Sequence, residues 1–516
     1  MKQSVSTKWF SFSEKDFFLG KNMPKKNLEK LIAGIEVVGS LGDRNREIEH
    51  IAFDSRKVRQ GSLFVAIPGK KYDGKTFLKE AVDKGAIAVI AQSSIKSLPS
   101  LITKTNNATT LCVEDSRKAL SKISANYYGQ PFKDLSLTGV TGTNGKTTLT
   151  YILEALSKAD GRNTGVIGTI DCHFGETVVP SSITTPESLD LNRSIRKMVD
   201  AGVSDCFLEV SSHALSQKRV FEMSFEAGIF TNLSRDHLDF HNDMGKYKNA
   251  KAKLFRENLI KTSIINIDDP VGKEFAEEFK VNTITTGINN MADFYAENIV
   301  LAGTQSRFTL KTPSGSIDIK TNLLGRHNIY NLLSAAACAS TRDISLEKIQ
   351  DTFKEIPAIP GRFESVKSGQ NFSVLVDYAH TQDALFKSIS ASKAFTRGEV
   401  IVVFGCGGDR DKGKRKEMGQ VAIKNANFTV ITSDNPRTED PEKIIADILK
   451  GIPSNGPYKT ITDRREAIAY AINRAKKNDL VLIAGKGHEN YQVLGMKKVR
   501  FDDREVAREF LRNRVH

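Results

Sequence analysis

The hydrophobic positions of this chain follow two recurring patterns. Short apolar runs, such as LFVAIPG at residues 63–69 and AIAVIAQ at 86–92, are typical of buried strands. The stretch 147–160 instead repeats its apolar residues at i, i+3, i+4 and i+7, which places them on one face of a helix. These residues are Leu149, Ile152, Leu153 and Leu156. The alternation of strand and helix patterns predicts an α/β protein.

The middle of the chain has the order strand, glycine-rich loop, helix. The run LSLTGV at 135–140 predicts the strand, and GVTGTNGKTT at 139–148 leads into the helix over 147–160. Further apolar runs, CFLEV, AGIFTNL and TSIINID, alternate with helical stretches. This alternation indicates a largely parallel sheet.

The last third of the chain repeats one rule. The apolar runs in FSVLVDYAH, EVIVVFGCGGDR, NFTVITSDNPR and DLVLIAGKGHE each end in a polar or glycine-rich loop. In open α/β sheets, ligands collect at the carboxyl ends of the strands. We therefore expect these four loops to converge on one edge of a sheet and to form a binding crevice.

The chain divides into three folded parts, as its 516 residues suggest, because one hydrophobic core rarely serves so long a chain. Gln130-Pro131 and the linker IPAIPGRFE mark the breaks. We predict an N-terminal extension (1–22), a small mixed α/β N-terminal domain (23–132), a central domain with a mostly parallel sheet (133–360) and a C-terminal Rossmann-like α/β domain (361–516).

Composition narrows the class of protein. Hydrophobic residues make up 39% and charged residues 26%, as in ordinary globular enzymes. The five cysteines are odd in number and form no C-x-x-C pair, which argues against a disulfide framework or a structural zinc site. No apolar run approaches the length of a membrane span, and charges interrupt the N-terminus. We expect a cytoplasmic protein without membrane contact.

The net charge of +14 raises the question of nucleic acid. Lysines and arginines are interleaved with acids along the whole chain, and no basic run carries aromatic stacking residues. A small polyanionic substrate is therefore the better partner, and a basic P-loop protein that binds nucleic acid stays as an alternative.

The glycine-rich loop has the features of a phosphate site. Gly142 and Gly145 let backbone N–H groups face phosphate oxygens, Lys146 offsets the phosphate charge, and Thr147 places a hydroxyl on magnesium. The general pattern requires a glycine where this chain has Val140. Because the loop follows a strand and opens a helix, we interpret the central part as a P-loop ATP-binding domain.

Candidate metal ligands follow two other strands. Glu209 ends a strand, and His237 and His241 are spaced i, i+4, as in a zinc pair on a helix. The zinc hydrolase pattern also requires glutamate directly after the first histidine, where this chain has Leu238. A carboxylate near ATP phosphates suits magnesium better, so zinc stays a minor alternative.

The loops of the last third carry charges suited to an amino acid. Arg410 and Arg437 can each hold a carboxylate through two hydrogen bonds, and Glu489 can accept an ammonium group. A ligand with both carboxylate and ammonium groups is therefore expected at this edge.

Ten motifs in order carry a resemblance to a known family. They are DSRKVRQGSLFVAIPGKKYDG, TGTNGKTT, EVSSHALSQKRV, TNLSRDHLDFH, LLGRHNIYNLLSA, PGRFE, VDYAHTQDAL, FGCGGDRDKGKR, DNPRTED and AGKGHE. Together they closely resemble the Mur ligase family, over nearly everything from Asp54 to Glu489. The loop of that family also lacks the early glycine, so the resemblance accounts for Val140.

The resemblance implies a reaction. In this family, ATP phosphorylates a carboxylate of a UDP-sugar peptide, and an incoming amine attacks the resulting acyl phosphate. The motifs are most similar to those of members that add the third residue of the peptidoglycan stem peptide. The implied activity is ligation of meso-2,6-diaminopimelate to UDP-N-acetylmuramoyl-L-alanyl-D-glutamate by a monomer, with ATP, Mg²⁺ and carbamylation of Lys251 by CO₂. From the pattern alone, Lys248, Lys251 and Lys253 form a solvated helix face.

The resemblance also assigns residues to roles. Catalysis falls to Lys146, Glu209, His237 and Lys251. Metal ligation falls to Thr147, Glu209, His237 and the carbamate of Lys251. ATP contacts fall to Gly142, Thr143, Asn144, Gly145, Lys146, Thr147, Thr148, Asn328, Arg362, Asp377, Tyr378 and His380. Contacts to the UDP-muramoyl dipeptide fall to Ser55, Thr184, Thr185, Ser211, Gln217 and Arg219. Diaminopimelate contacts fall to Arg410, Asp434, Asn435, Arg437, Gly485 and Glu489.

Two related ligations remain as alternatives. Lysine could take the place of diaminopimelate, although the arginine of DNPR matches the members that bind the distal carboxylate of diaminopimelate, which lysine lacks. A ligase similar to folylpolyglutamate synthetase would share the loop and the lysine, but the DSR motif and DNPR disfavour it.

Overall fold

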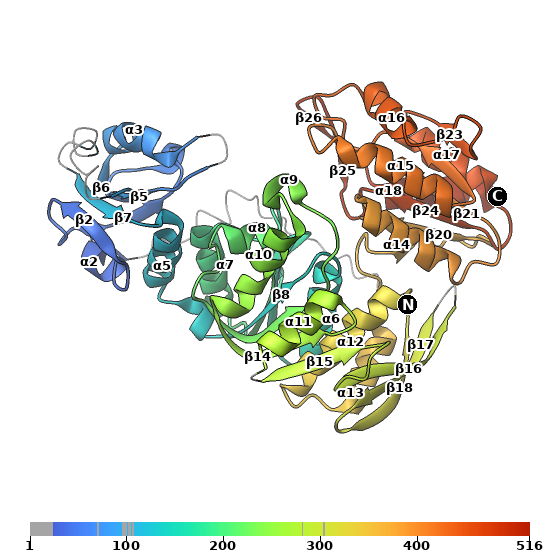
Figure 1. The fold of residues 1–516 in the computed structure, drawn as a ribbon, viewed down its shortest axis with the longest axis horizontal. Helices are drawn as coiled ribbons and strands as arrows, with labels where there is room; N and C mark the ends of the chain where they lie inside the picture. Colours follow the sequence, from blue (N-terminus) through green and yellow to red (C-terminus); the bar gives the residue numbers. More distant parts are fainter. Residues whose placement is uncertain are drawn as a thin grey trace, which may run out of the picture.

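The computed structural model describes residues 24–69, 72–94, 101, 105, 108–280, 282–302 and 305–515. The extension expected over residues 1–22 lies outside the described residues. Figure 1 shows three lobes, with the central lobe between the N-terminal lobe (blue) and the C-terminal lobe (orange to red). Three large sheets, one in each lobe, form the framework.

The N-terminal lobe is built on a five-stranded sheet of order β2-β7-β6-β5-β4. Its strands are β2 (Val37–Leu41), β4 (His50–Ala52), β5 (Ser62–Ala66), β6 (Ala86–Gln92) and β7 (Thr109–Val113). Its other elements are β1 (Lys26–Asn27), α2 (Leu28–Leu31), β3 (Glu47–Ile48), η1 (Ser55–Lys57), η2 (Gly74–Phe77), α3 (Leu78–Asp83) and α5 (Ser116–Tyr128), followed by η4 (Pro131–Lys133). The sheet is parallel except for β2, so the mixed α/β character expected here is confirmed.

The central lobe has an eleven-stranded sheet of order β11-β10-β9-β12-β8-β13-β14-β15-β16-β17-β18. The strands are β8 (Ser136–Thr141), β9 (Thr164–Ile167), β10 (Asp171–Phe174), β11 (Thr177–Pro180), β12 (Asp205–Glu209), β13 (Ser224–Phe230), β14 (Leu259–Asn266), β15 (Thr283–Gly287), β16 (Phe294–Leu301), β17 (Ser306–Thr312) and β18 (Gly315–Thr321). The seven neighbouring strands in the middle of this order run parallel; they are β9, β12, β8, β13, β14, β15 and β16. Antiparallel strands extend both edges, which the apolar runs did not predict.

The helices of the central lobe are interspersed with the strands of its sheet. They are α6 (Lys146–Ala159), α7 (Ser188–Asp200), α8 (Ser212–Ser216), α9 (Leu238–His241), α10 (Met244–Arg256), α11 (Pro270–Glu278), α12 (Arg326–Ser340) and α13 (Leu346–Glu355). The apolar face predicted for α6 is confirmed, because its four residues belong to the main core cluster together with residues of α12. That packing fixes the helix that follows the glycine-rich loop.

The C-terminal lobe has a six-stranded sheet of order β19-β20-β24-β21-β22-β23. Its strands are β19 (Glu364–Ser365), β20 (Ser373–Asp377), β21 (Val400–Phe404), β22 (Phe428–Ile431), β23 (Tyr458–Thr460) and β24 (Leu480–Ala484), with a separate hairpin of β25 (Tyr491–Leu494) and β26 (Lys497–Arg500). Its helices are α14 (Gln382–Lys393), α15 (Gly413–Asn425), α16 (Pro441–Leu449), α17 (Arg464–Arg474) and α18 (Asp503–Val515). Strands β20, β24, β21 and β22 are parallel neighbours, so the four polar loops share one edge as expected.

Candidate active site

The glycine-rich loop joins β8 to α6 and needs its glycines for space. A Cβ atom on Gly142 would lie 1.9 Å from Thr231 Oγ1, and one on Gly145 would lie 2.5 Å from Asn331 Oδ1. Both glycines also have positive φ angles, of 147° and 92°. Val140 is fully buried in the core, so the departure from the general loop pattern is a packed strand residue.

Lys146 begins α6 and curls back over the loop. Its Nζ donates to the carbonyl oxygens of Gly142 and Thr143, each at 2.9 Å. Burial lowers the pKa of Lys146, whereas the charges of Glu209 and Asp236 oppose that shift. An ammonium group held against loop carbonyls can turn outward to an anion that enters the loop.

Other loop residues connect the central and C-terminal lobes. Asn144 Nδ2 and Ser234 Oγ donate to Asp383 Oδ2 of α14 at 3.1 and 2.6 Å. Thr143 Oγ1 lies 3.1 Å from the hydroxyl of Tyr247, and Thr148 is buried in the first turn of α6. Asp383 was not predicted from the sequence. Its position at the start of a helix, directly after the polar loop of β20, is the signal that could have found it.

Glu209 ends β12 next to the start of α6. Its carboxylate is 1% exposed and accepts hydrogen bonds from Thr147 Oγ1 at 3.0 Å, Thr169 N at 2.7 Å and Thr169 Oγ1 at 3.0 Å. The pairing of a loop hydroxyl with a strand-end carboxylate gives two oxygen donors of the kind that magnesium prefers.

Lys251 lies inside the protein, so the prediction of a solvated face is wrong for this lysine. It is 1% exposed, its Nζ donates to Gly142 O at 2.7 Å, and it stands 4.6 Å from the centre of the Tyr247 ring. Lys248 meets that prediction, because it reaches Glu274 at the surface. Burial, and next the charge of Lys146, hold the pKa of Lys251 well below its usual value, while Asp236 opposes this.

His237 and Asp236 lie at the start of α9. His237 has a left-handed backbone, with φ of 53°, and its Nε2 is 3.5 Å from Asp236 Oδ2. Burial lowers the pKa of His237. The charge of Asp236 raises this pKa, whereas the charges of Lys146 and Lys251 lower it further. Asp236 was not predicted from the sequence, although it directly precedes the candidate ligand His237.

The second histidine of the pair spaced i, i+4 contacts a serine. His241 Nε2 lies 2.9 Å from Ser212 Oγ, and the ring is buried. Over the described ranges, no group of three or more histidine, cysteine, aspartate or glutamate side chains is arranged to hold a metal. Glu209 and His237 therefore do not belong to one such cluster in this arrangement.

Four of the five remaining expected ATP contacts lie where the C-terminal lobe meets the loop. Arg362 Nη2 donates to Thr147 Oγ1 at 3.0 Å, and the guanidinium lies 4.6 Å from the Tyr378 ring centre. Its buried Nε has no hydrogen-bond partner among the described residues. His380 Nδ1 donates a hydrogen bond to Tyr378 O at 2.8 Å, and Asp377 Oδ2 accepts a hydrogen bond from Phe363 N at 2.9 Å. The orphaned Nε is a donor suited to an anionic ligand.

Asn328 lies behind the loop. Its Oδ1 accepts a hydrogen bond from Asn331 Nδ2 at 3.1 Å, and Asn331 is the residue that approaches Gly145. Asn328 Nδ2 donates to Leu324 O at 2.8 Å. In this arrangement Asn328 supports the loop through Asn331.

Five of the six residues expected to contact the UDP-sugar peptide form one hydrogen-bonded network. Thr185 Oγ1 donates to Glu209 O at 2.8 Å and lies 3.2 Å from Ser211 Oγ. Arg219 donates to Thr185 O and to Gln217 Oε1, each at 2.6 Å. Thr184 joins the network through Thr169, at 3.1 Å between hydroxyl oxygens.

Ser55, the sixth residue, lies apart in the N-terminal lobe, where it is buried at the start of η1. The two lobes meet at Glu187, whose Oε1 lies 3.4 Å from Arg117 Nη1 of α5 and 3.0 Å from Arg219 Nε. Glu187 therefore ties the network to the helix that precedes the central lobe.

The loops after β21, β22 and β24 bring the expected amino-acid contacts together. Asn435 Nδ2 donates to Glu489 Oε2 at 2.8 Å. A Cβ atom on Gly485 would lie 2.6 Å from Asp434 Oδ2, and one on Gly407 would lie 2.9 Å from Arg437 Nη1. Arg410 is exposed on the same loop as Gly407 and donates to Asp409 O at 3.5 Å.

Arg437 is held in a left-handed conformation, with φ of 53°. The β25–β26 hairpin holds this backbone, since Arg437 N donates to Val493 O at 3.0 Å and Gly495 N donates to Arg437 O at 2.8 Å. The guanidinium donates to Gly408 O at 2.8 Å. Within the described part of the chain, no carboxylate forms an ion pair with Arg437, so its charge is free to bind a carboxylate.

Lys486 was missed by sequence reasoning although it stands inside GKGHE. It is fully buried, and its Nζ lies 3.1 Å from both Asn435 Oδ1 and Glu489 Oε2. Its Nζ therefore fixes Asn435 and Glu489 relative to each other.

A partly buried histidine outside the expected site anchors the β9–β10 turn. His173 lies 2.6 Å from Asp171 Oδ1 and 3.0 Å from Glu154 Oε1. Burial alone would lower the pKa of His173, but the hydrogen bonds to the two carboxylates raise it to about 9. Glu154 has a pKa of about 2, because hydrogen bonds to His173 and Lys158 outweigh the effect of its burial.

The contacts of His173 with Asp171 and Glu154, which we call the His173 clamp, predict a pH dependence of stability. Because the pKa of His173 is raised to about 9 from 6.5, its contribution is complete below pH 6.5 and is lost as pH rises through 9. We expect the melting temperature to fall between these pH values, and to fall less in His173→Gln. Calorimetry of both proteins across this range checks it; parallel pH profiles would contradict the clamp.

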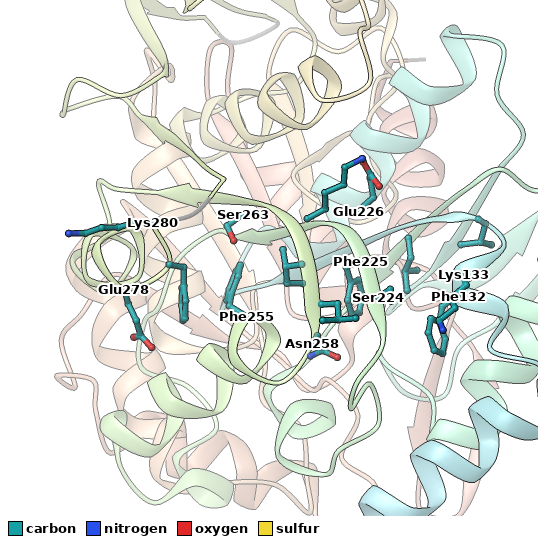
Figure 2. A pocket seen from close by; sticks show the side chains of 16 residues that line it. Phe132, Lys133, Ser224, Phe225, Glu226, Phe255, Asn258, Ser263, Glu278 and Lys280 are labelled. Carbon is teal, nitrogen blue, oxygen red and sulfur yellow. The ribbon is translucent and has the colours of Figure 1, made fainter. Parts of the chain in front are cut away.

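The cleft in Figure 2 lies away from these residues. It has a volume of about 760 Å³ and is lined by Phe132, Phe225, Phe255, Asn258, Lys280 and their neighbours, from the amino ends of β8, β13 and β14 and the ends of α10 and α11. The glycine-rich loop follows the carboxyl end of β8. The candidate site is therefore on the opposite edge of the sheet from this cleft.

No helix among the described residues has both the length and the apolar character to cross a membrane.

Three family models match the chain. Mur ligase family, catalytic domain, matches residues 47–128; Mur ligase middle domain matches 140–339; and Mur ligase, glutamate ligase domain, matches 361–487. The UDP-N-acetylmuramoyl-L-alanyl-D-glutamate–2,6-diaminopimelate ligase 1 of Clostridium acetobutylicum is 43% identical over 487 residues, which are 94% of this chain and 99% of that protein.

Solved structures agree. A structure of a UDP-N-acetylmuramoyl-L-alanyl-D-glutamate–2,6-diaminopimelate ligase has a TM-score of 0.68 and 32% identity, and the match covers 95% of this chain and 100% of that one. The MurF ligase of Thermotoga maritima, in complex with ADP, has a TM-score of 0.59 and 19% identity, with 90% and 97% of the chains covered. The second likeness concerns the fold alone.

Proposed function

The chain belongs to the Mur ligase family, and from this premise we propose that it ligates meso-2,6-diaminopimelate to UDP-N-acetylmuramoyl-L-alanyl-D-glutamate in peptidoglycan synthesis, with conversion of ATP to ADP and phosphate. One observation carries the choice of ligand: the guanidinium of Arg437, which forms no ion pair within the described part of the chain, stands on the sheet edge that also holds Glu489. A diamino acid with a distal carboxylate matches both charges.

In this proposal the three parts of the chain divide the substrates. Residues 23–132 hold the uridine end, 133–360 hold ATP and the peptide carboxylate, and 361–516 hold diaminopimelate. The contact of Arg362 with Thr147 supports this division, because it brings the C-terminal lobe to the phosphate loop. The carboxylate that ATP phosphorylates then meets the amine between the two lobes.

The ATP phosphates are proposed to lie on the loop N–H groups of residues 142–148. Lys146, released from the carbonyls of Gly142 and Thr143, offsets the charge of the transferring phosphoryl group. The orphaned Nε of Arg362 supplies a second donor. Phosphoryl transfer to the peptide carboxylate gives an acyl phosphate; attack by the amine of diaminopimelate forms the amide bond and releases phosphate.

Magnesium fits the oxygen donors of this site. Thr147 and Glu209 would hold it, with His237 and the carbamate of Lys251 completing the proposed set. When bound, magnesium neutralises phosphate charge. The buried Lys251 supports the carbamate, because an uncharged amine attacks CO₂: the N–C bond forms, the nitrogen loses a proton, and an anionic oxygen donor takes the place of the amine.

Product analysis tests the proposal. The protein is incubated with ATP, Mg²⁺ and UDP-muramoyl dipeptide plus diaminopimelate, with a folate plus glutamate, or with polynucleotide. We expect phosphate release and a product heavier by one diaminopimelate less water only with the first set. ATP hydrolysis stimulated by polynucleotide, or glutamate added to folate, would refute the proposal in favour of the alternative concerned.

A further inference from the structure

Thr169, in the turn between β9 and β10, contacts two parts of the proposed site. Its backbone N donates to Glu209 Oε1 at 2.7 Å, and its hydroxyl donates to Glu209 Oε2 at 3.0 Å. The same hydroxyl oxygen lies 3.1 Å from Thr184 Oγ1. Thr169 therefore stands between a residue proposed to contact the sugar peptide and a residue proposed to hold magnesium.

The direction of these hydrogen bonds follows from the number of protons. An ionised carboxylate has none, so Glu209 can only accept, and Thr169 must use its single hydroxyl proton on Glu209. The Thr169 oxygen can then only accept from Thr184. Thr184 is left with lone pairs, which suit a peptide N–H of a bound substrate.

The turn is held close to Glu209. A Cβ atom on Gly168 would lie 2.3 Å from Glu209 Oε1, so glycine is required for this approach. Beyond the turn, Asp171 is fixed by His173 at 2.6 Å and by the Tyr151 hydroxyl at 3.3 Å. The orientation of the Glu209 carboxylate thus depends on a turn that is anchored from behind.

We propose that Thr169 is a positioning residue that couples occupancy of Thr184 by the sugar peptide to the metal affinity of Glu209. The inference rests on the proposed function. A substrate that orders Thr184 fixes the Thr169 hydroxyl on Glu209 and so favours metal binding, and by linkage bound metal favours the sugar peptide equally. The metal would then be held most tightly when the carboxylate to be phosphorylated is present.

The coupling can be measured without turnover. The affinity for Mn²⁺ is determined by paramagnetic resonance, without ATP, in the absence and presence of UDP-muramoyl dipeptide. We expect the dipeptide to raise Mn²⁺ affinity about fivefold or more in the unaltered protein, within the usual range of coupling between sites. In Thr169→Val, which keeps the shape and the backbone N–H, the increase should fall below about twofold; Thr169→Ser should retain it.

Thr286→Val is the matched control. Thr286 is a fully buried threonine of the same sheet, and its hydroxyl has no hydrogen-bond partner in the part of the chain that the structure describes. It should leave the coupling unchanged. Full coupling in Thr169→Val, or equal loss in Thr169→Ser, would overturn the role of Thr169 while leaving the ligase proposal intact. Failure of the unaltered protein to bind the dipeptide would overturn both.

Discussion

Replacement of Lys251 by alanine is expected to lower kcat for ligation by about 10²- to 10³-fold, the usual effect of removing one electrostatic stabiliser from an active site. The side chain is buried between the loop carbonyl of Gly142 and the ring of Tyr247, and no carboxylate forms an ion pair with it in the described ranges. A permanent ammonium there would repel magnesium. The buried, readily deprotonated amine instead suits conversion to a carbamate.

Chemical rescue is the measurement that separates this role from a packing role. Added formate or acetate should restore part of the activity of Lys251→Ala, because a small carboxylate can supply the lost anionic oxygen. Lys248→Ala, on the same helix but paired with Glu274 at the surface, is the matched control and should behave as the unaltered protein. Undiminished activity of Lys251→Ala without any added carboxylate would rule out the carbamate.

Replacement of Arg437 by alanine is expected to reduce kcat/KM for diaminopimelate by about 30- to 5,000-fold, which corresponds to the roughly 2–5 kcal/mol lost when one partner of a desolvated charge pair is removed. The affinity for ATP should change little, since Arg437 contacts Gly408 and the β25–β26 hairpin and not the phosphate loop.

Separate titrations of ATP and diaminopimelate binding check this prediction. Arg500→Ala is the matched control. Arg500 lies on the β25–β26 hairpin that contacts Arg437, but it is largely exposed and paired with Glu505. Equal losses of ATP and diaminopimelate affinity in Arg437→Ala would contradict the assignment of this residue to the distal carboxylate.

The parallel framework could be predicted from the sequence because its signals are local. The apolar face of α6 and the buried runs of β6, β12 and β24 each arise from residues close together in the sequence. The antiparallel strands at both edges of the central sheet were missed, because they are short or half exposed and lack long apolar runs. The helix pattern did not predict the burial of Lys251, since this burial depends on α10 packing beside a loop about a hundred residues earlier. Only the resemblance distinguished this lysine from its neighbours.

The candidate site could likewise be predicted only in part from the sequence. Motifs identified Glu209, which ends β12, and Arg437, which lies in the loop after β22, because the strand ends of a parallel sheet share an edge. Thr169, Asp236, Asp383 and Lys486 were missed, since each acts through a contact with another candidate residue. Ser55 remains apart from the others in this arrangement of lobes, so its role in binding the sugar peptide stays a prediction.

The most direct test of the account is the rate of phosphate release with UDP-muramoyl dipeptide, ATP and either diaminopimelate or lysine. A site built to bind a polar group rejects the analogue that lacks it, because its own buried charge is left unpaired. We predict that kcat/KM for phosphate release is at least about 30-fold higher with diaminopimelate than with lysine. This factor corresponds to the lower end of the roughly 2–5 kcal/mol given for Arg437. Equal rates with the two amines would contradict the role assigned to Arg437, and no release with either would contradict the ligase itself.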